Sequence, residues 1–347
     1  MRHSIRVFSL DLGKFVVLTE AASGFYALTP LIAALAGAKT VLALTRDSRY
    51  GSAAEVKQYT MELAQHWGVK NRLVVLDSRE DPRVGQADIV TNLGFVRPLD
   101  ATFIARLKST AVVPLMWETW EYRPSDLDLD AARSKGLCVL GTNEHHETLR
   151  TFDYIGHLAL KMLYEVQVEV FGSRIAVLGR GEFAAIVANL LEQVGARVRR
   201  VSTEEEHAPA PEVVEKAVSD AEALVVVDHE SKGMLIGGEG APVSSAALAS
   251  WNPGVVVVHI CGGVDREGLV NAGIRCWPEA FAPVGSMSVT TEYLGPRPLV
   301  DLHSAGLKVG EMLALERRKG LGAFDAECSV LRQSALAQGF AGYHPFS

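Results

Sequence analysis

The chain has 347 residues, of which 48% are hydrophobic and 22% charged, and its formal net charge at pH 7 is -7. This composition excludes a disordered chain, and the length exceeds what one ordinary hydrophobic core organises. The acidic balance argues against a nucleic-acid partner, because such a protein needs a basic surface to displace counterions.

The cysteines and the apolar runs indicate the cellular compartment of the protein. The four cysteines form no C-x-x-C pair and are too sparse for a disulfide scaffold. No apolar run reaches the roughly 18 residues that a membrane-spanning helix needs, and the first residues do not resemble a signal peptide. We therefore expect a cytoplasmic protein with no membrane partner.

Short apolar runs alternate with amphipathic stretches over the first 145 residues. The runs are continuously apolar, which is typical of strands buried on both faces of a parallel sheet. The alternation predicts a flavodoxin-like α/β domain. The predicted strands are 15–19, 40–45, 72–76, 89–92, 111–115 and 137–141, with helices at 54–67, 101–107 and 127–135.

A second βα series follows a predicted linking helix at 148–164. Its strands are predicted at 174–178, 197–201, 223–228, 255–260 and 274–277, with helices at 182–194, 211–219 and 244–250. A loop at 278–298 leads to helices at 299–317 and 324–337. We therefore predict two Rossmann-like domains with a cleft between them: a substrate domain of residues 1–145 and 299–347, and an inserted NAD(P)-binding domain of residues 146–298.

The run R-I-A-V-L-G-R-G-E-F-A at 174–184 is the strongest local motif. Gly179 permits a tight turn, Gly181 lets a pyrophosphate approach the backbone, and Ala184 lets the helix pack on the strand. The free N–H groups and positive dipole end of the helix attract phosphates. The motif predicts an NAD or NADP site, although a Rossmann-like domain without this cofactor is the alternative. The expected cofactor contacts of the turn are Gly179, Arg180, Gly181, Glu182 and Phe183.

The end of the following strand leaves the choice between NAD and NADP open. An NAD site has an acidic residue there for the ribose 2′-hydroxyl, whereas this chain has Ser202 and Thr203, which we expect to line the ribose. Arg199 and Arg200 precede them and suit a 2′-phosphate. The three glutamates at 204–206 can instead supply the missing carboxylate.

Four stretches share a pattern with a known family. They are D-L-D-A-A-R-S-K-G-L-C-V-L-G (128–141), V-F-G-S-R-I-A-V-L-G-R-G-E-F-A (170–184), G-G-V-D-R-E-G-L (262–269) and L-H-S-A-G (302–306). Together with the domain order, they resemble the D-isomer-specific 2-hydroxyacid dehydrogenases, which include formate and phosphoglycerate dehydrogenases. The resemblance implies a homodimer and an NAD(P)-dependent oxidoreductase that transfers a hydride to or from a small hydroxy or keto carboxylate. It also implies that His303 is the acid/base residue.

The sequence departs from the family at two places. The family has an arginine before its G-x-x-V-D stretch to hold the substrate, but this chain has His259, Ile260 and Cys261 there. The family's acidic partner of the catalytic histidine is also displaced. Its nearest candidate is Glu279, and Glu292 is a second. These departures leave room for a divergent substrate.

Other candidate site residues follow predicted strands, where open α/β sheets bind ligands. His259 ends an apolar strand and either faces the nicotinamide or substrate, as a catalytic residue, or is a structural histidine. Cys261 lies in the glycine-flanked turn beside the expected cofactor. Asp228 and His229 follow another strand, where ribose and nicotinamide contacts are usual. For His229 a solvated loop position is the alternative.

The loop M-W-E-T-W-E-Y-R at 116–123 concentrates aromatic, acidic and basic side chains after a buried strand. It predicts a substrate site with Trp117 and Glu118, in which Arg123 or Arg97 replaces the missing arginine. The alternative is a surface hairpin that packs on the other domain or on a dimer partner. His145 and His146 lack further ligands, so we expect no metal.

Two other functions remain open from the sequence. The run V-V-V-V-H-I-C-G-G-V-D resembles S-adenosylhomocysteine hydrolase, which implies a tightly held NAD and no net redox change. The other alternative is a nucleotide-binding regulator without catalysis.

Overall fold

The computed structural model describes residues 1–202 and 209–341. The chain divides into two compact units: unit 1 is Met1–Thr151 with Pro296–Ser347, and unit 2 is Phe152–Gly295. Unit 2 is therefore an insertion in unit 1, divided from it at 151/152 and 295/296, where the sequence placed the boundaries at 145/146 and 298/299. Within the described ranges, no helix combines the length and apolar character needed to cross a membrane.

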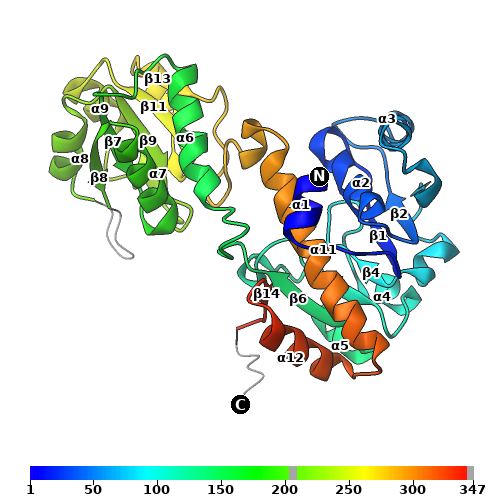
Figure 1. Ribbon diagram of the computed structural model, residues 1–347. Helices are drawn as coiled ribbons and strands as arrows, with labels where there is room; N and C mark the ends of the chain where they lie inside the picture. Colours follow the sequence, from blue (N-terminus) through cyan, green and yellow to red (C-terminus); the bar gives the residue numbers. More distant parts are fainter. Residues whose placement is uncertain (203–208, 342–347) are drawn as a thin grey trace. The chain divides into compact units, whose positions relative to one another are not determined.

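The sheet of unit 1 has seven strands in the order β14-β6-β5-β4-β1-β2-β3 (Figure 1). Its pairings are parallel, except that β14 runs antiparallel to β6. Along the chain, the parallel strands have the order 3-2-1-4-5-6, which is the Rossmann order, whereas the expected flavodoxin-like order is 2-1-3-4-5. The strands are β1 (Val16–Glu20), β2 (Thr40–Leu44), β3 (Leu73–Leu76), β4 (Ile89–Val90), β5 (Val112–Pro114), β6 (Cys138–Thr142) and β14 (Ala337–Gln338).

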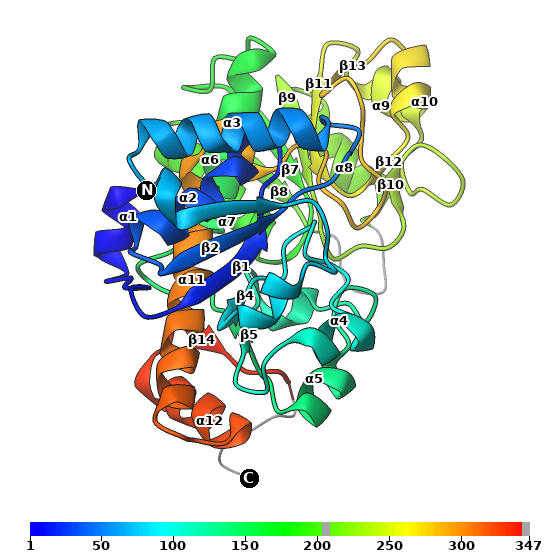
Figure 2. The same ribbon diagram turned by 90° about the vertical axis from the view of Figure 1, so that its right-hand side faces the viewer.

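Both faces of this sheet are buried, as its continuously apolar strands predict. Val17 and Val41 pack in a cluster with α2 and α11. Leu18 and Leu42, which point to the other face, pack with α4 and α5 (Figure 2). The helices of unit 1 are α1 (Arg2–Val7), α2 (Leu28–Leu35), α3 (Ala53–His66), α4 (Ala101–Arg106), α5 (Leu129–Lys135), α11 (Arg297–Arg318) and α12 (Ala323–Gln333).

Unit 2 has a parallel five-stranded sheet in the order β13-β11-β9-β7-β8, which is the order 2-1-3-4-5 along the chain. Val177 and Val225 pack with α6 and α7 on one face, and Leu178 and Val226 with α8, α9 and α10 on the other. Its strands are β7 (Arg174–Leu178), β8 (Arg197–Val201), β9 (Ala223–Val227), β10 (Met234–Ile236), β11 (Val256–Cys261), β12 (Gly263–Val264) and β13 (Arg275–Trp277). Its helices are α6 (Asp153–Glu165), α7 (Gly181–Gln193), α8 (Pro211–Val218), α9 (Ser245–Trp251) and α10 (Arg266–Asn271).

The structure differs from the sequence-based prediction mainly in short elements. Strands β10 and β12 pair with each other in a small separate sheet, and β14 occupies part of the segment predicted as the last helix. Strands this short carry too few residues to show a period. The predicted helix at 148–164 begins only at Asp153.

Candidate functional site

The glycine turn of unit 2 has the backbone that a dinucleotide site needs. Gly179 has φ of 156°, and a Cβ there would lie 2.0 Å from the carbonyl oxygen of Val227. Gly181 has φ of 69° and begins α7. Only glycine fits this approach of the turn to β9, because the obstacle at Gly179 is backbone. The turn therefore points the first N–H groups of α7 to the carboxyl edge of the sheet.

The loop after β9 covers this turn. The side chain of Asp228 is fully buried, and its Oδ1 accepts hydrogen bonds from the backbone N–H groups of Glu230 (3.1 Å) and Ser231 (2.8 Å). The Nε atom of Arg180 lies 3.5 Å from Asp228 Oδ1 and 3.6 Å from Glu230 Oε2. Asp228 thus shapes the loop, and Glu230, which sequence reasoning missed, reaches the turn.

Aromatic rings join the loop to the first turn of α7. The ring of His229 stacks on Phe183 with centroids 4.1 Å apart, and Phe183 lies 5.3 Å from the ring of Phe152. Glu182 is exposed beside them. His229 is therefore packed on the helix rather than free in solvent, in contrast to the alternative raised from the sequence.

The end of β8 is only partly described. Ser202 is exposed after the last residue of the strand, and Thr203 and the glutamates at 204–206 lie outside the described residues. Arg199 forms an ion pair with Asp220 and donates a hydrogen bond to the carbonyl of Lys216. Its guanidinium is thereby held by residues of α8 and the turn after it.

His259 is enclosed in unit 2 with both ring nitrogens bonded. Nε2 lies 2.8 Å from the carbonyl oxygen of Gly262, which can only accept, so Nε2 carries the ring hydrogen and donates it. Burial lowers the pKa of the ring, so Nδ1 is unprotonated and accepts the hydroxyl proton of Ser288 at 2.7 Å, while Ser288 Oγ accepts the N–H of Ala282. The ring is fully buried and stacks on Phe281, with centroids 4.2 Å apart. This geometry corrects the catalytic interpretation of His259, because neither nitrogen is available to a substrate.

Cys261, two residues later, is also buried. Burial, and then the charge of the nearby Asp228 carboxylate, raise the pKa of its thiol to about 12. The thiol therefore stays protonated and packs in the core of unit 2. Its carbonyl accepts the N–H of Asp228 at 3.0 Å, so the backbone at Cys261 supports the loop over the glycine turn.

His303 lies on α11 in unit 1, and its residue is 4% exposed. A hydrogen bond of 2.7 Å joins its Nδ1 to the hydroxyl of Thr29 on α2. Burial lowers the pKa of the His303 ring to about 3, so the ring is neutral at pH 7. The expected partner Glu279 belongs to unit 2 and is exposed, and the partner that the structure gives His303 is a threonine hydroxyl.

Of the substrate-site candidates in unit 1, the structure brings Arg97 and Trp117 together. The guanidinium of Arg97 lies over the Trp117 ring, 5.1 Å from its centroid, and pairs with Asp126 at 2.7 Å. Its Nε atom is buried and has no hydrogen-bond partner in the described part of the chain. Arg123, in contrast, is exposed.

Glu118 belongs to a group of buried acids that the sequence did not reveal. Its two carboxylate oxygens accept hydrogen bonds from Trp120 Nε1 at 2.7 Å and from the N–H of Glu144 at 3.0 Å. A further contact of 2.9 Å joins Glu118 to Nδ1 of His145. Burial, and then the charges of Glu121 and Glu118, raise the pKa of Glu144 to about 9. Glu144 therefore holds a proton at pH 7.

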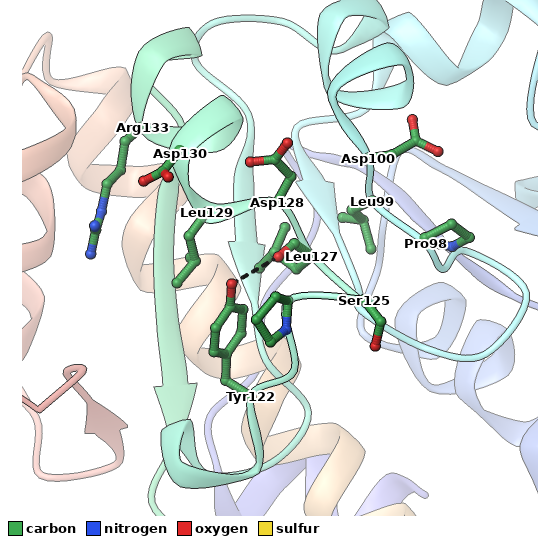
Figure 3. A pocket seen from close by; sticks show the side chains of 11 residues that line it. Pro98, Leu99, Asp100, Tyr122, Ser125, Leu127, Asp128, Leu129, Asp130 and Arg133 are labelled. Carbon is green, nitrogen blue, oxygen red and sulfur yellow. Dashed lines mark hydrogen bonds between the residues drawn. The ribbon is translucent and has the colours of Figure 1, made fainter.

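A surface pocket of about 540 Å³ lies between the first turns of α4 and α5 (Figure 3). Its polar groups are largely used by the fold. Asp100 and Asp128 cap the two helices by accepting N–H groups of Phe103 and Ala131, and the Tyr122 hydroxyl donates to the carbonyl of Leu127. The other polar side chains of its lining are Ser125, Asp130 and Arg133. Among the described residues, no group of histidine, cysteine or acidic side chains is arranged to hold a metal ion.

Comparison with known proteins finds chains of similar fold. No protein-family model and no curated sequence matches the chain. Among solved structures, a dipicolinate synthase chain from Bacillus subtilis matches 94% of this chain and 100% of its own length, with a TM-score of 0.52 and 12% identity. The corresponding dipicolinate synthase chain from Bacillus halodurans matches 87% of this chain and 97% of its own length, with a TM-score of 0.50 and 12% identity.

The chain shares its fold with these two dipicolinate synthase chains. The α/β fold that the sequence predicts is thereby confirmed. The NAD⁺-bound 3-phosphoglycerate dehydrogenase of Entamoeba histolytica also matches, over 88% of this chain and 96% of its own, with a TM-score of 0.42 and 10% identity.

Proposed function

We propose that the chain is an NAD(P)-dependent oxidoreductase that interconverts a small hydroxy carboxylate and the corresponding keto carboxylate. The observation that carries this proposal is the turn between β7 and α7, where Gly179 and Gly181 have backbone conformations and close contacts that exclude side chains. Such a turn at the start of a helix is the recurrent device for a dinucleotide pyrophosphate.

Several residues of unit 2 fit this cofactor. The N–H groups at the start of α7 and the guanidinium of Arg180 suit the pyrophosphate. The stacked rings of Phe183 and His229 form an apolar wall beside the turn. The exposed Ser202 carries no charge, so it accepts the ribose of NAD or NADP without repulsion. The choice between the two cofactors is left to measurement.

On the substrate side, we propose Arg97 as the anion-binding residue of unit 1. The guanidinium of Arg97 packs over the ring of Trp117. The buried Nε of Arg97 is a donor to which a substrate carboxylate could bind. Arg97 would thereby replace the arginine that is absent before Gly262. Trp117 and Glu118 remain proposed neighbours of the substrate.

The proposed reaction also requires a side chain that accepts or donates the proton of the substrate hydroxyl. When bound, the nicotinamide accepts or supplies the hydride, so that hydroxy carboxylate and NAD(P)⁺ become keto carboxylate, NAD(P)H and a proton. We propose that His303 handles this proton. Because its ring is neutral at pH 7, His303 is ready to accept the proton of the hydroxyl, although a pKa near 3 makes it a weak base.

The proposal is tested with purified full-length protein, first by mass spectrometry of released ligands and by titration with NADH and NADPH. A panel of 2-keto acids is then screened for loss of NAD(P)H absorbance. Cofactor binding with turnover of at least one acid is the expected result. Binding without any turnover would favour the nucleotide-binding regulator, and absence of binding would refute the proposed function.

A His303→Gln variant is expected to lose turnover by about 10²–10⁴-fold, because glutamine cannot exchange the proton. Cofactor affinity should be unchanged, since the glycine turn belongs to unit 2. The matched control is Thr29→Val, which removes the hydrogen bond to Nδ1 but keeps the ring. Steady-state kinetics on both variants checks the assignment. Wild-type turnover by His303→Gln would exclude His303 as the acid/base residue.

A further inference from the structure

The glycine turn is already occupied by a carboxylate of the chain itself. A Cβ built on Gly181 would lie 2.1 Å from Glu230 Oε1. Gly181 is the position at which a bound pyrophosphate approaches the backbone of such a turn. The Glu230 carboxylate therefore stands where the cofactor's negative charge is expected.

Charge explains why the carboxylate lies there. The first turn of α7 presents N–H groups and the positive end of the helix dipole, which attract any anion. Glu230 Oε2 is also 3.6 Å from Nε of Arg180, and Glu230 Oε1 is 3.9 Å from Nε2 of His229. These same groups suit the cofactor phosphates, so Glu230 and the pyrophosphate compete for them.

The position of Glu230 is also fixed by its backbone. Its N–H donates to the fully buried carboxylate of Asp228, and the neighbouring His229 is stacked on Phe183. The side chain itself is 42% exposed, so it can swing into solvent without unfolding the loop. Nε of Arg180 is buried and has no hydrogen-bond partner among the described residues, so Glu230 holds it by charge at 3.6 Å and not by a hydrogen bond.

We infer that Glu230 is a built-in competitor of the dinucleotide, which occupies the pyrophosphate position of the glycine turn and must leave when the cofactor binds. This inference rests on the proposed function, since it names a control on the same site. The competition lowers the apparent affinity of the protein for the dinucleotide, because only molecules in which Glu230 has left the turn can bind it. An anion held at a helix start and beside one arginine is worth a modest energy, so we expect a modest competition.

The test is calorimetric titration of the full chain with NADH, NADPH and ADP-ribose, the last of which has the pyrophosphate but no nicotinamide. A Glu230→Gln variant removes the charge and should bind about three- to tenfold tighter than wild type. Glu230→Asp keeps the charge but is one methylene shorter, so it should also bind tighter than wild type. Glu239→Gln removes the same charge from an exposed position of unit 2 and should match wild type.

The outcomes distinguish the competition by Glu230 from the proposed function. Tighter binding by both Glu230 variants, with Glu239→Gln unchanged, supports the competition. If wild type binds a dinucleotide and Glu230→Gln binds it equally or more weakly, the competition is overturned while the proposed function stands. Equal gains in dinucleotide affinity in Glu230→Gln and Glu239→Gln would show that the change in net charge causes the gain, and would also overturn the competition. If neither wild type nor Glu230→Gln binds any of the three probes, the proposed function itself fails.

Discussion

A Gly179→Ala variant is expected to lose dinucleotide binding and to destabilise unit 2 by roughly 3 kcal/mol. The added methyl group would lie 2.0 Å from the carbonyl oxygen of Val227 and 2.6 Å from its carbon. Both obstacles are backbone atoms of β9 and cannot rotate away. A φ of 156° at Gly179 adds strain for any other residue. Thermal unfolding and titration with NADH and NADPH measure the two effects.

Gly233→Ala is the matched control, because Gly233 is also in unit 2 and nothing lies within 4 Å of a Cβ placed there. Its stability and cofactor binding should equal those of wild type. Retained binding in a stably folded Gly179→Ala variant would show that the turn tolerates a side chain, contrary to its geometry in this structure.

The second large effect is expected at Glu144, where Glu144→Gln should stabilise the protein increasingly as the pH rises. Burial is the main cause that raises the pKa of Glu144 to about 9, and the neighbouring acids add to it. Glutamine has the shape of the protonated acid but does not ionise. We expect a gain of about 2 kcal/mol at pH 8, or about 5 °C in Tm.

The direction follows from the raised pKa. In the unfolded chain Glu144 ionises near its ordinary value of 4.5, whereas in the folded chain it stays protonated up to about pH 9. Its contribution to stability is therefore complete below pH 4.5 and is lost as the pH rises towards 9. Thermal melts from pH 5 to pH 9 should diverge between wild type and variant. Parallel curves, or an equal change in the exposed control Glu147→Gln, would contradict the buried, protonated state of Glu144.

Much of the fold is predictable from the sequence because short stretches of neighbouring residues determine the strands and the glycine turn. Apolar runs such as 175–178 and 223–227 lie in β7 and β9, since strands buried on both faces admit few polar residues. The glycine turn is equally local, because a steric requirement at Gly179 fixes the residue type.

The chemistry of the site depends on contacts that are distant in sequence. The role of His259 is decided by Ser288, which follows it by 29 positions, and the protonation of His303 by its burial against α2, where Thr29 is 274 positions away. The proton on Glu144 is retained first because the group is buried, and then because Glu121 and Glu118 approach it from another loop. No short motif encodes these distances. The homodimer implied by the resemblance stays a prediction.

The insertion of unit 2 into unit 1 has a consequence for the order in which the protein can form during synthesis. All of unit 2 has been translated by Gly295, and its core is then complete. Unit 1 at that moment still lacks α11, whose Leu307 and Leu313 belong to its central cluster. Its first 151 residues must therefore persist with the part of the sheet face that α11 covers still exposed. Nascent chains halted before Pro296 should therefore recruit chaperones through unit 1 alone, while unit 2 is already protected from proteolysis.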